Sequence, residues 1–372
     1  MEFKINSREL KQAVAKVRGV TGSPISNPAI EYIHVQADGE TVRFMATNLN
    51  VTAICEVEAD VQAGGEILFP PLCVDVFPGL PDGVVSIRCN AEKISISIGR
   101  FRSKLTGLGA DQYPVIERLQ EYQQITMDAE ALSSAIRFLL PFTTIDKSRF
   151  ELDGIFWVLE KHRMEMVATD GRRLGIVWNG YPEDSFTDKH EALVSKHTCE
   201  TLLKTLPKSG VVIVRFAPRR IEFDMPGQVI QANLLTPNFP QYQRIIPDEQ
   251  FPEFTIERKP LIEALRRVAK VTDTELCKVR MAFNGDAVTL GGEYSEKGAE
   301  GEEQLEYEPL TDEPLPEILF NVHYMLDHLT SFKGDVLKFA INQRKPIVIT
   351  CEDEPDRKAL VMPIRPQEED EA

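Results

Sequence analysis

The sequence lacks the clustered cysteines and histidines that mark metal and redox sites. Its six cysteines contain no C-x-x-C pair, which excludes a zinc knuckle or a dithiol redox centre. They stand at Cys55, Cys73, Cys89, Cys199, Cys277 and Cys351. Among the six histidines, His323 and His328 are closest together, but a five-residue spacing does not align two ligands on a helix. We therefore expect neither a metal nor another cofactor.

Motifs of catalysis and of membrane insertion are also missing. The chain contains no phosphate-binding glycine loop, nucleophile elbow or zinc signature, so we expect a non-catalytic protein. No apolar run reaches the roughly 20 residues that cross a bilayer. The opening MEFKINSREL has no apolar core of a signal peptide. These absences predict a cytoplasmic protein.

The chain also lacks an excess of positive charge. Its negative charge is concentrated in two segments. The net charge is −16, and the segment from Glu293 to Glu317 holds ten acids against Lys297. Four more acids lie in the tail from Glu368 to Glu371, so these two segments carry thirteen of the sixteen net negative charges. The rest of the chain is close to neutral, and a polyanion partner is not excluded.

The chain contains one unit three times. The segments FKINSRELKQAVAKV (3–17), ITMDAEALSSAIRFL (125–139) and FTIERKPLIEALRRV (254–268) superpose without a gap. Each predicts a short strand followed by a helix with apolar residues at i, i+3, i+4 and i+7. These stripes are Leu10, Ala13, Val14, Val17; Leu132, Ala135, Ile136, Leu139; and Leu261, Ala264, Leu265, Val268.

Further signals define the organisation of each unit. Asn6 and Asp128 occupy N-cap positions, and Pro260 is tolerated in a first helical turn. A second helix, a glycine turn and a β-branched strand recur later in each unit, and Pro78 should shorten this helix in the first unit. Alternating strands predict antiparallel sheets with one buried face. We expect an α+β fold of three tandem domains, 1–122, 123–252 and 253–372.

Four motifs on this repeat resemble the bacterial DNA polymerase III beta subunit, the sliding clamp. They are ATDGRRL (168–174), NFPQYQRIIP (238–247), FNVHYMLDHL (320–329) and VMPIR (361–365). The resemblance covers essentially the whole chain. It implies three DNA-clamp domains, with sheets outside and two helices per domain lining the inner face of a ring-shaped homodimer. Such a ring encircles double-stranded DNA and tethers DNA polymerase and clamp-loader subunits, without catalysis.

The resemblance also implies which residues face the DNA. The inner helices and one ring edge contribute basic side chains for loose, sequence-independent phosphate contacts. The predicted set is Lys11, Lys16, Arg18, Lys147, Arg149, Phe150, Lys196, Lys204, Arg266 and Arg267. The chain departs from the family at Pro24, at Pro71 to Cys73 and at Pro78, where basic residues are frequent. Taken singly, each cation also fits an ordinary solvated helix face.

Ring closure is expected between a basic strand and an acidic one. The strand KISISIGRFRSK of the first unit would meet the acidic segment of the third unit, in two identical heterologous contacts. The predicted interface comprises Lys93, Arg100, Arg102, Lys104, Leu105, Lys270, Val271, Glu296, Glu300, Glu302 and Glu303. The alternative is that the acidic segment is only a solvated hairpin and loop.

A partner pocket is implied between the second and third domains. Apolar residues there would accept a leucine or phenylalanine anchor, and arginines would hold peptide carbonyls or carboxylates. The predicted lining is Leu152, Thr169, Gly171, Arg172, Arg173, Leu174, Pro240, Arg244, Ile245, Leu360, Met362, Pro363, Ile364 and Arg365. We give Arg173 more weight than Arg172, whose position varies in the family. Without the resemblance, these residues are typical of core packing and a turn.

Two alternatives to a clamp remain open from the residues alone. A protein-binding repeat scaffold that does not contact DNA would fit the acidic balance. An enzyme would have to assemble catalytic residues from parts that the three units do not share. Retention on DNA discriminates between a clamp and the other classes, because a ring leaves only when the DNA circle is cut.

Overall fold

The computed structural model describes residues 1–22, 27–144, 146, 148–181, 186, 188–236, 238–273, 275–294 and 297–365. Two predicted site residues, Lys147 and Glu296, lie outside these ranges. By its contacts the chain divides into two compact units. The first comprises 1–133, 182–185 and 197–235, and the second comprises 134–181, 186–196 and 236–372. The division falls inside the middle repeat, because its strands contribute to a sheet of each unit.

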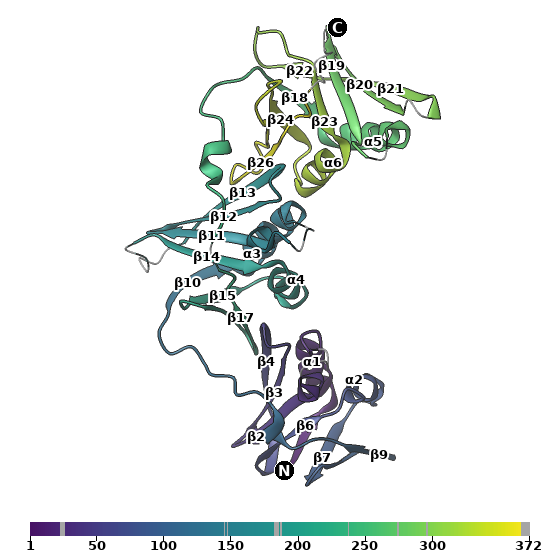
Figure 1. The fold of residues 1–372 in the computed structure, drawn as a ribbon. Coiled ribbons are helices and arrows are strands. Elements are labelled where there is room, and N and C mark those ends of the chain that lie inside the picture. The colour runs from purple at the N-terminus through teal and green to yellow at the C-terminus, as the bar shows by residue number, and fades with distance from the viewer. Residues whose placement is uncertain are drawn as a thin grey trace. The chain divides into compact units, whose positions relative to one another are not determined.

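The elements repeat in the order that the sequence predicts (Figure 1). The first repeat contains β1 (Glu2–Asn6), α1 (Ser7–Arg18), β2 (Ile33–Asp38), β3 (Thr41–Thr47), β4 (Val51–Glu58), β5 (Asp60–Ala63), β6 (Gly65–Phe69), α2 (Cys73–Val76), β7 (Val84–Asn90), β8 (Lys93–Ile98) and β9 (Phe101–Thr106). The second contains β10 (Gln123–Asp128), α3 (Ala129–Leu139), β11 (Gly154–Glu160), β12 (Arg163–Thr169), β13 (Arg173–Gly180), β14 (His190–Ser195), α4 (Lys196–Thr205), β15 (Val211–Phe216), β16 (Arg220–Met225) and β17 (Gln228–Asn233). The third contains β18 (Glu253–Glu257), α5 (Arg258–Val268), β19 (Lys278–Asn284), β20 (Ala287–Tyr294), β21 (Ala299–Glu306), β22 (Glu308–Pro309), β23 (Ile318–Asn321), α6 (Val322–Ser331), β24 (Val336–Ala340), β25 (Ile347–Thr350) and β26 (Arg357–Val361).

Each unit is built on two sheets. The first unit has a five-stranded sheet, β5-β1-β7-β8-β9, and an eight-stranded sheet, β10-β15-β16-β17-β4-β3-β2-β6. The second unit has a nine-stranded sheet, β14-β11-β12-β13-β26-β25-β24-β18-β22, and a four-stranded sheet, β21-β20-β19-β23. All described pairings within these sheets are antiparallel. The two largest sheets therefore each join strands of two successive repeats, through β17 with β4 and through β13 with β26.

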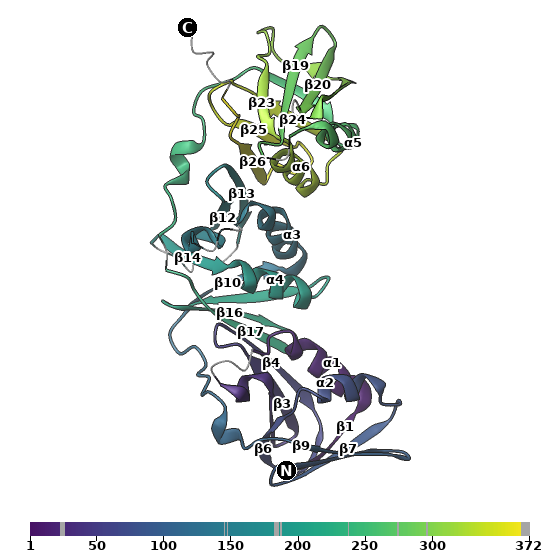
Figure 2. The same cartoon turned by 45° about the vertical axis from the view of Figure 1, so that its right-hand side comes forward.

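The amphipathic helices form as their patterns predict. All twelve residues of the three apolar stripes are buried, which confirms the repeat alignment. Asn6 Oδ1 accepts from Arg8 N at 2.9 Å, and Asp128 Oδ1 accepts from Ala131 N at 2.9 Å, so both predicted N-caps are present. In Figures 1 and 2, α1 lies beside α2 in the first unit, and α5 lies beside α6 in the second.

Two segments differ in length from the simplest sequence pattern. Helix α2 ends at Val76 and continues as a 3₁₀ turn, Phe77–Gly79, which confirms the shortening expected from Pro78. The prediction of one strand over KISISIGRFRSK was wrong. It forms the hairpin β8–β9, in which Ile98 pairs with Phe101 across a turn where Gly99 has φ +51°.

Among the described residues, every helix is too short or too polar to cross a bilayer. Within the same ranges, no group of three or more His, Cys, Asp or Glu side chains is arranged to hold a metal ion. The six cysteines are all free thiols, of which Cys89 and Cys277 are half-buried and the other four are buried.

Candidate functional site

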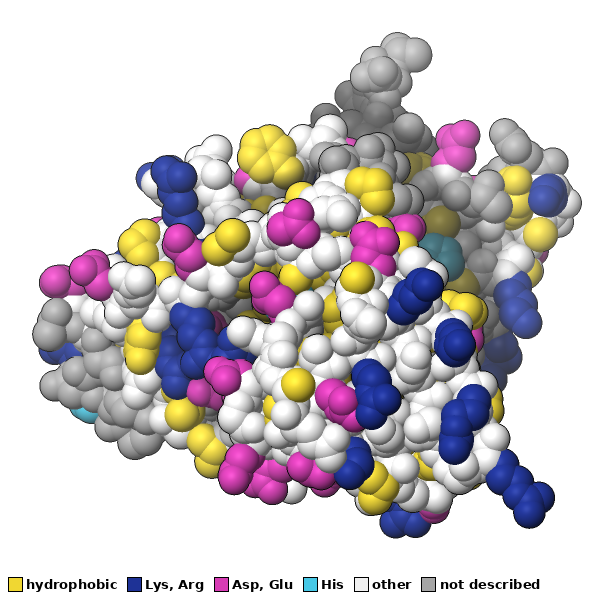
Figure 3. Space-filling view, turned by 90° about the horizontal axis from the view of Figure 1, so that it is seen from below, with side chains coloured by type: hydrophobic (Ala, Val, Ile, Leu, Met, Phe, Trp, Pro, Cys, Tyr) yellow, Lys and Arg dark blue, Asp and Glu magenta, His cyan; other side chains and the backbone are white. Residues whose placement is uncertain are grey.

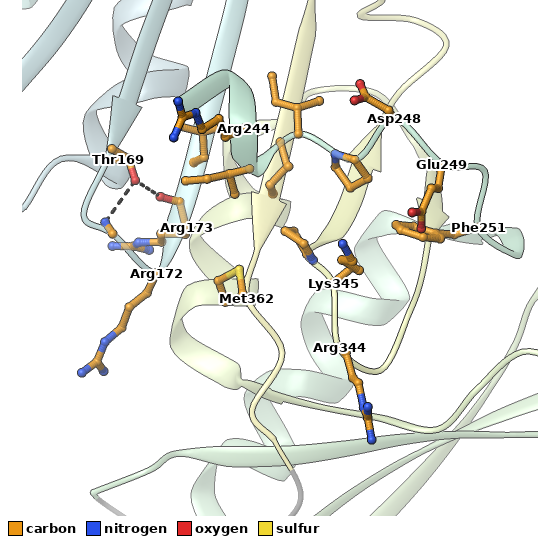
Figure 4. A pocket seen from close by; sticks show the side chains of 17 residues that line it. Thr169, Arg172, Arg173, Arg244, Asp248, Glu249, Phe251, Arg344, Lys345 and Met362 are labelled. Atoms are coloured by element: carbon orange, nitrogen blue, oxygen red, sulfur yellow. Dashed lines mark hydrogen bonds between the residues drawn. The ribbon is translucent and has the colours of Figure 1, made fainter. Parts of the chain in front are cut away.

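A pocket of about 490 Å³ lies in the second unit, where the strands of two repeats meet. Its walls come from the β12–β13 turn, the end of β26, the loop before β25 and the segment 244–251 (Figure 4). The side chains are mixed: Leu174, Ile245, Ile246, Phe251 and Met362 give an apolar surface, with cationic residues around it. This composition suits a ligand that has both an apolar part and hydrogen-bond acceptors.

The strand register places the apolar wall. Leu174 and Leu360 are directly opposite each other in the β13–β26 pair, and both are buried. Met362 follows β26, and its N–H donates to the carbonyl of Arg172 at 2.9 Å. This hydrogen bond extends the pairing past the end of the strand and sets Met362, 39% exposed, at the centre of Figure 4. The pocket wall thus combines the adaptable side chain of Met362 with the buried side chains of Leu174 and Leu360.

An aromatic cluster anchors the opposite wall. Tyr242, 1% exposed, begins the 3₁₀ helix Tyr242–Ile245. Its ring packs edge-on against Phe156 and Phe239, at centroid distances of 6.4 and 6.1 Å, and those two rings are stacked at 4.7 Å. Tyr242 is thus buried at the start of this short helix, and Arg244 and Ile245 further along it line the pocket.

The β12–β13 turn is held by its own side chains. Thr169 Oγ1 donates to the carbonyl of Arg173 at 2.6 Å and accepts from Gly171 N at 3.0 Å, and both bonds are drawn in Figure 4. Asp170 Oδ1 accepts from the N–H groups of Arg172 and Arg173. Gly171 adopts φ +88°, which favours glycine at this position. The motif ATDGRRL therefore encodes a rigid turn as well as a pocket wall.

The two adjacent arginines have different environments. Arg172 is exposed and extends away from the other lining side chains in Figure 4. Arg173 is 8% exposed, and its Nε donates to Asp170 Oδ2 at 2.8 Å while its Nη1 donates to Asp327 Oδ2 at 2.5 Å. Its guanidinium also lies over the ring of Tyr324, 4.6 Å from the centroid. Arg173 is thus bound to carboxylates of the chain itself.

The predicted pocket residues fall into two groups. Nine line the pocket: Thr169, Gly171, Arg172, Arg173, Leu174, Arg244, Ile245, Leu360 and Met362. Five are not among the lining residues: Leu152, Pro240, Pro363, Ile364 and Arg365. Leu152 is fully buried, and the carbonyl of Pro240 accepts from Tyr242 N at 2.7 Å, so these two support neighbouring segments.

Sequence reasoning missed the far end of the pocket. The additional lining residues are Ile246, Pro247, Asp248, Glu249, Phe251, Arg344, Lys345 and Pro346. Ile246 and Pro247 belong to the motif NFPQYQRIIP that was recognised, so that motif already contained a signal for them. The loop 342–346 has no motif. Asn342 Oδ1 accepts from Arg344 N and Lys345 N, and the loop reaches the pocket only because β25 pairs with β26.

The predicted DNA-facing residues lie on helices and at one loop. Arg18, Lys204, Arg266 and Arg267 are exposed, whereas Lys11 Nζ donates to the carbonyl of Leu80 at 2.6 Å and Lys16 Nζ to that of Gly227 at 3.4 Å. Lys196 is half-buried at the start of α4. Figure 3 shows a face on which many Lys and Arg side chains stand along one side, despite the negative net charge.

Two further observations concern side chains of the second unit. Phe150 is 61% exposed, and Arg149 Nη1 donates to the carbonyl of Asp170 at 3.0 Å, next to the pocket turn. Arg137 on α3 is exposed and was missed. The repeat alignment contained the signal, because Arg137 stands at the position of Arg266 in the third unit.

The residues predicted at the dimer interface lie on two sheet edges. Strand β9 ends the five-stranded sheet and β21 ends the four-stranded sheet. Lys93, Arg100, Arg102 and Lys104 are exposed on the β8–β9 hairpin, and Leu105 is 8% exposed. Lys270 and Val271 lie in the 3₁₀ turn Ala269–Val271, with Val271 against Gly301 of β21.

The acidic edge is partly neutralised within its own repeat. Arg267 donates to both carboxylate oxygens of Glu303, at 2.8 and 2.6 Å, and this pair holds the pKa of Glu303 below its ordinary value. Arg280 pairs with Glu302 at 2.7 Å. Glu300 is exposed on the same strand. The structure thus brings together Arg267 and Glu303, which the sequence assigned to two different surfaces.

Comparisons with known proteins agree with this architecture. Family models of the DNA polymerase III beta subunit match in order: the N-terminal domain at 1–117, the central domain at 126–241 and the C-terminal domain at 243–365. The beta sliding clamp of Caulobacter vibrioides is 25% identical over 376 residues, covering 98% of this chain and 100% of the relative. That of Chlamydia muridarum is 23% identical over 369 residues, covering 98% and 99%.

Solved structures show the same fold. A sliding clamp from Pseudomonas aeruginosa, crystallised bound to griselimycin, superposes with a TM-score of 0.93 at 23% identity, covering 98% of this chain and all of that one. The clamp from Bacillus subtilis superposes with a TM-score of 0.91 at 20% identity, covering 98% and 99%. The three-domain architecture is therefore common to these proteins at low identity.

Proposed function

Because the chain belongs to the DNA polymerase III beta subunit family, we infer that it is a sliding clamp, a non-catalytic processivity factor of DNA replication. The observation that carries this conclusion is the match of all three domain models, in order, over nearly the whole chain. We place the domain boundaries at 1–122, 123–252 and 253–372. The proposed location is the cytoplasm, where bacterial DNA is replicated.

The clamp works as a homodimer that encloses double-stranded DNA. The open edges β9 and β21 belong to the first and third repeats, so a head-to-tail pair of chains has two such junctions and closes. Exposed cations on the inner helices, such as Arg18, Lys204 and Arg266, contact phosphates weakly and without reading sequence. Weak contacts allow sliding, while the closed ring prevents escape.

The pocket receives short linear motifs of DNA polymerase and clamp-loader subunits. Its apolar wall of Leu174, Leu360 and Met362 accepts a leucine or phenylalanine side chain of a motif rich in Gln, Leu and Phe. Arg172, Arg244, Arg344 and Lys345 outnumber Asp248 and Glu249 around it, which favours acidic residues beside the motif.

Retention on DNA of different topology tests the clamp function. The protein, loaded by its clamp loader and ATP onto a nicked circular plasmid, is expected to stay bound through gel filtration in moderate salt. Cutting the plasmid once should release it, because a ring slides off a free end. Equal loss from circular and linear DNA would instead indicate a scaffold or a simple DNA-binding protein.

A further inference from the structure

The pocket turn has a counterpart in the first repeat with the same hydrogen bonds. Between β3 and β4, Thr47 Oγ1 donates to the carbonyl of Val51 at 3.0 Å and accepts from Leu49 N at 3.0 Å. Asn48 Oδ1 accepts from the N–H groups of Asn50 and Val51. Thr169 and Asp170 make the same four bonds between β12 and β13. The two turns are therefore equivalent, and Val51 corresponds to Arg173.

Comparison of Val51 with Arg173 shows which interactions the turn requires and which occur only beside the pocket. Val51, 1% exposed, has no charge, yet its turn keeps the four hydrogen bonds. The ion pairs of Arg173 are thus not required for a turn of this geometry. They occur at the turn that borders the apolar pocket.

The guanidinium of Arg173 is fixed from three sides. Asp170 of its own turn holds Nε, Asp327 of α6 holds Nη1, and the ring of Tyr324, one turn earlier on α6, lies 4.6 Å below it. Helix α6 belongs to the third repeat and Arg173 to the second. The Asp327 contact therefore joins the two repeats directly behind the pocket wall.

A fixed arginine acts differently from a mobile one. An arginine side chain loses rotamer entropy when it is immobilised, and a group that is already ordered avoids this cost on binding. With 7% of its side chain exposed and two carboxylates in contact, Arg173 has little freedom left to follow a ligand. The exposed Arg172 has that freedom.

We propose that Asp327 is a positioning residue for the peptide pocket: it fixes Arg173 against Tyr324, so that Arg173 forms a rigid wall for the peptide and is not a mobile ligand for its carboxylates. This inference rests on the proposed peptide-binding function of the pocket. The bound partner is a short motif with an apolar anchor. Acidic residues that flank this anchor pair with the mobile cations of the pocket, such as Arg172.

Replacement of Asp327 distinguishes the two roles of Arg173. In Asp327→Asn, Arg173 is kept but released, so a direct ligand would bind the peptide as well as before or better. A positioned wall would instead bind it about tenfold more weakly, with faster dissociation, within the usual range of coupling between sites. Affinity is measured by fluorescence anisotropy of a labelled peptide with the Gln, Leu and Phe motif.

Matched variants keep the test specific. Asp327→Glu should restore most of the affinity, and Asp335→Asn, which removes the exposed Lys259–Asp335 pair of the same repeat, should leave it unchanged. In an Arg173→Ala background, Asp327→Asn should have little further effect. Thermal unfolding of each variant controls for folding.

The outcomes that overturn the inference are separate from those that overturn the pocket assignment. Asp327→Asn binding as tightly as the parent, or losing equal affinity in the Arg173→Ala background, would refute the positioning role. Absence of peptide binding by the parent chain itself would refute the peptide pocket, and the positioning role with it.

Discussion

Single residues around the pocket carry distinct tasks that their type alone does not reveal. Met362 stands half-exposed over Leu174 and Leu360, so it supplies the adaptable part of an apolar surface. His328, directly behind Leu360, is fully buried, with its Nδ1 on the carbonyl of Tyr324 and its Nε2 2.9 Å from that of Leu360. Met362 thus lines the pocket, and His328 supports its wall.

We expect Met362→Ala to weaken binding of the labelled peptide about tenfold, because it removes an apolar contact at the centre of the pocket. Arg173→Ala should weaken it as well, since it removes the fixed wall. Neither side chain lies on β9 or β21, so sedimentation should show the same dimer in both variants. Unchanged affinity in both would contradict the pocket assignment.

The pKa of His328 predicts a pH dependence of stability. Burial lowers it to about 4 and outweighs the two backbone carbonyls, which raise it, while nearby Arg173 lowers it further and Asp327 raises it. Between pH 6.5 and 4 the unfolded chain binds a proton that the folded chain does not, so the free energy of unfolding decreases as pH falls. We expect a loss of about 2 kcal/mol from this residue between pH 7 and 5.

Denaturant unfolding at both pH values, in the parent and in His328→Gln, checks this expectation. The loss on acidification should be smaller in the variant, since its side chain does not titrate. The difference between the two proteins isolates His328 from the other histidines. Equal losses in both would show that His328 is not responsible.

At the scale of elements, the two inter-repeat junctions share their geometry and differ in polarity. Val51 pairs with Ala232 and Thr52 with Gln231 in β4–β17, as Arg173 pairs with Val361 and Leu174 with Leu360 in β13–β26. The apolar Leu174, Leu360 and Met362 thus correspond to Thr52, Gln231 and Asn233.

The linker between the first two repeats contacts the first junction. Gln231 Nε2 and Arg220 Nη1 both donate to the carbonyl of Glu117, at 3.2 and 3.0 Å, which pins the linker to the sheet. Two cavities lie at this junction, of about 190 and 400 Å³, and most of their lining residues are polar or charged; the cavity at the second junction measures about 490 Å³. The same strand pairing has produced a junction lined by Thr52, Gln231 and Asn233 and another lined by Leu174, Leu360 and Met362.

We therefore expect one peptide bound per chain. An apolar anchor placed against the polar residues of the first junction would remove them from water, which costs free energy. Isothermal titration of the full chain with the labelled peptide measures this number. Met362→Asn, which places the residue type of the first junction in the second, should weaken binding more than Met362→Ala. A stoichiometry of two would show that the first junction also binds the motif.

At the scale of the whole molecule, the proposed dimer would join two edges with opposite charge. Arg102 and Lys104 on β9 would meet an acidic β21 on which Glu302 and Glu303 already have partners, Arg280 and Arg267. The electrostatic attraction between chains is thus smaller than the run of acids suggests. The edge strands and Phe101, 41% exposed on β9, add backbone pairing and apolar contact.

Dimerisation should weaken as salt rises, because exposed charges are screened beyond about 8 Å at physiological ionic strength. We expect the dimer dissociation constant to increase about tenfold between 50 and 500 mM NaCl, measured by sedimentation velocity. Lys104→Glu should raise it at low salt and reduce the salt dependence. A dimer that is insensitive to salt would count against the electrostatic account.

Local features of the fold could be predicted from the sequence, and features made by distant contacts could not. The stripe of Leu10, Ala13, Val14 and Val17, the caps Asn6 and Asp128 and the stop at Pro78 each depend on residues within a few positions. The helical period determines which neighbouring residues share the buried face and which backbone N–H groups a cap can reach. The turn inside KISISIGRFRSK was missed although the alternation of Ile94, Ile96 and Ile98 breaks at Gly99, since the next apolar residue is Phe101.

The predicted residues that do line the pocket lie in the recognised motifs or, for Leu360, directly beside one. Arg344 and Lys345 come from a loop without a periodic pattern, and they reach the pocket through the pairing of β25 with β26. The carboxylate that holds Arg173 lies 154 positions away in the chain, on α6. No local rule relates two residues at that separation, so the fixed state of Arg173 was not predicted.

The sequence by itself determined the threefold repeat, the α+β class, the helices with their buried stripes and the family, because these depend on periodicity and motifs along the chain. Only the tertiary structure decided that the loop 342–346 lines the pocket, that Arg267 pairs with Glu303, and that Arg173 is held by Asp327. These outcomes depend on which distant side chains sheet pairing brings within hydrogen-bond distance, and that is a property of the folded chain.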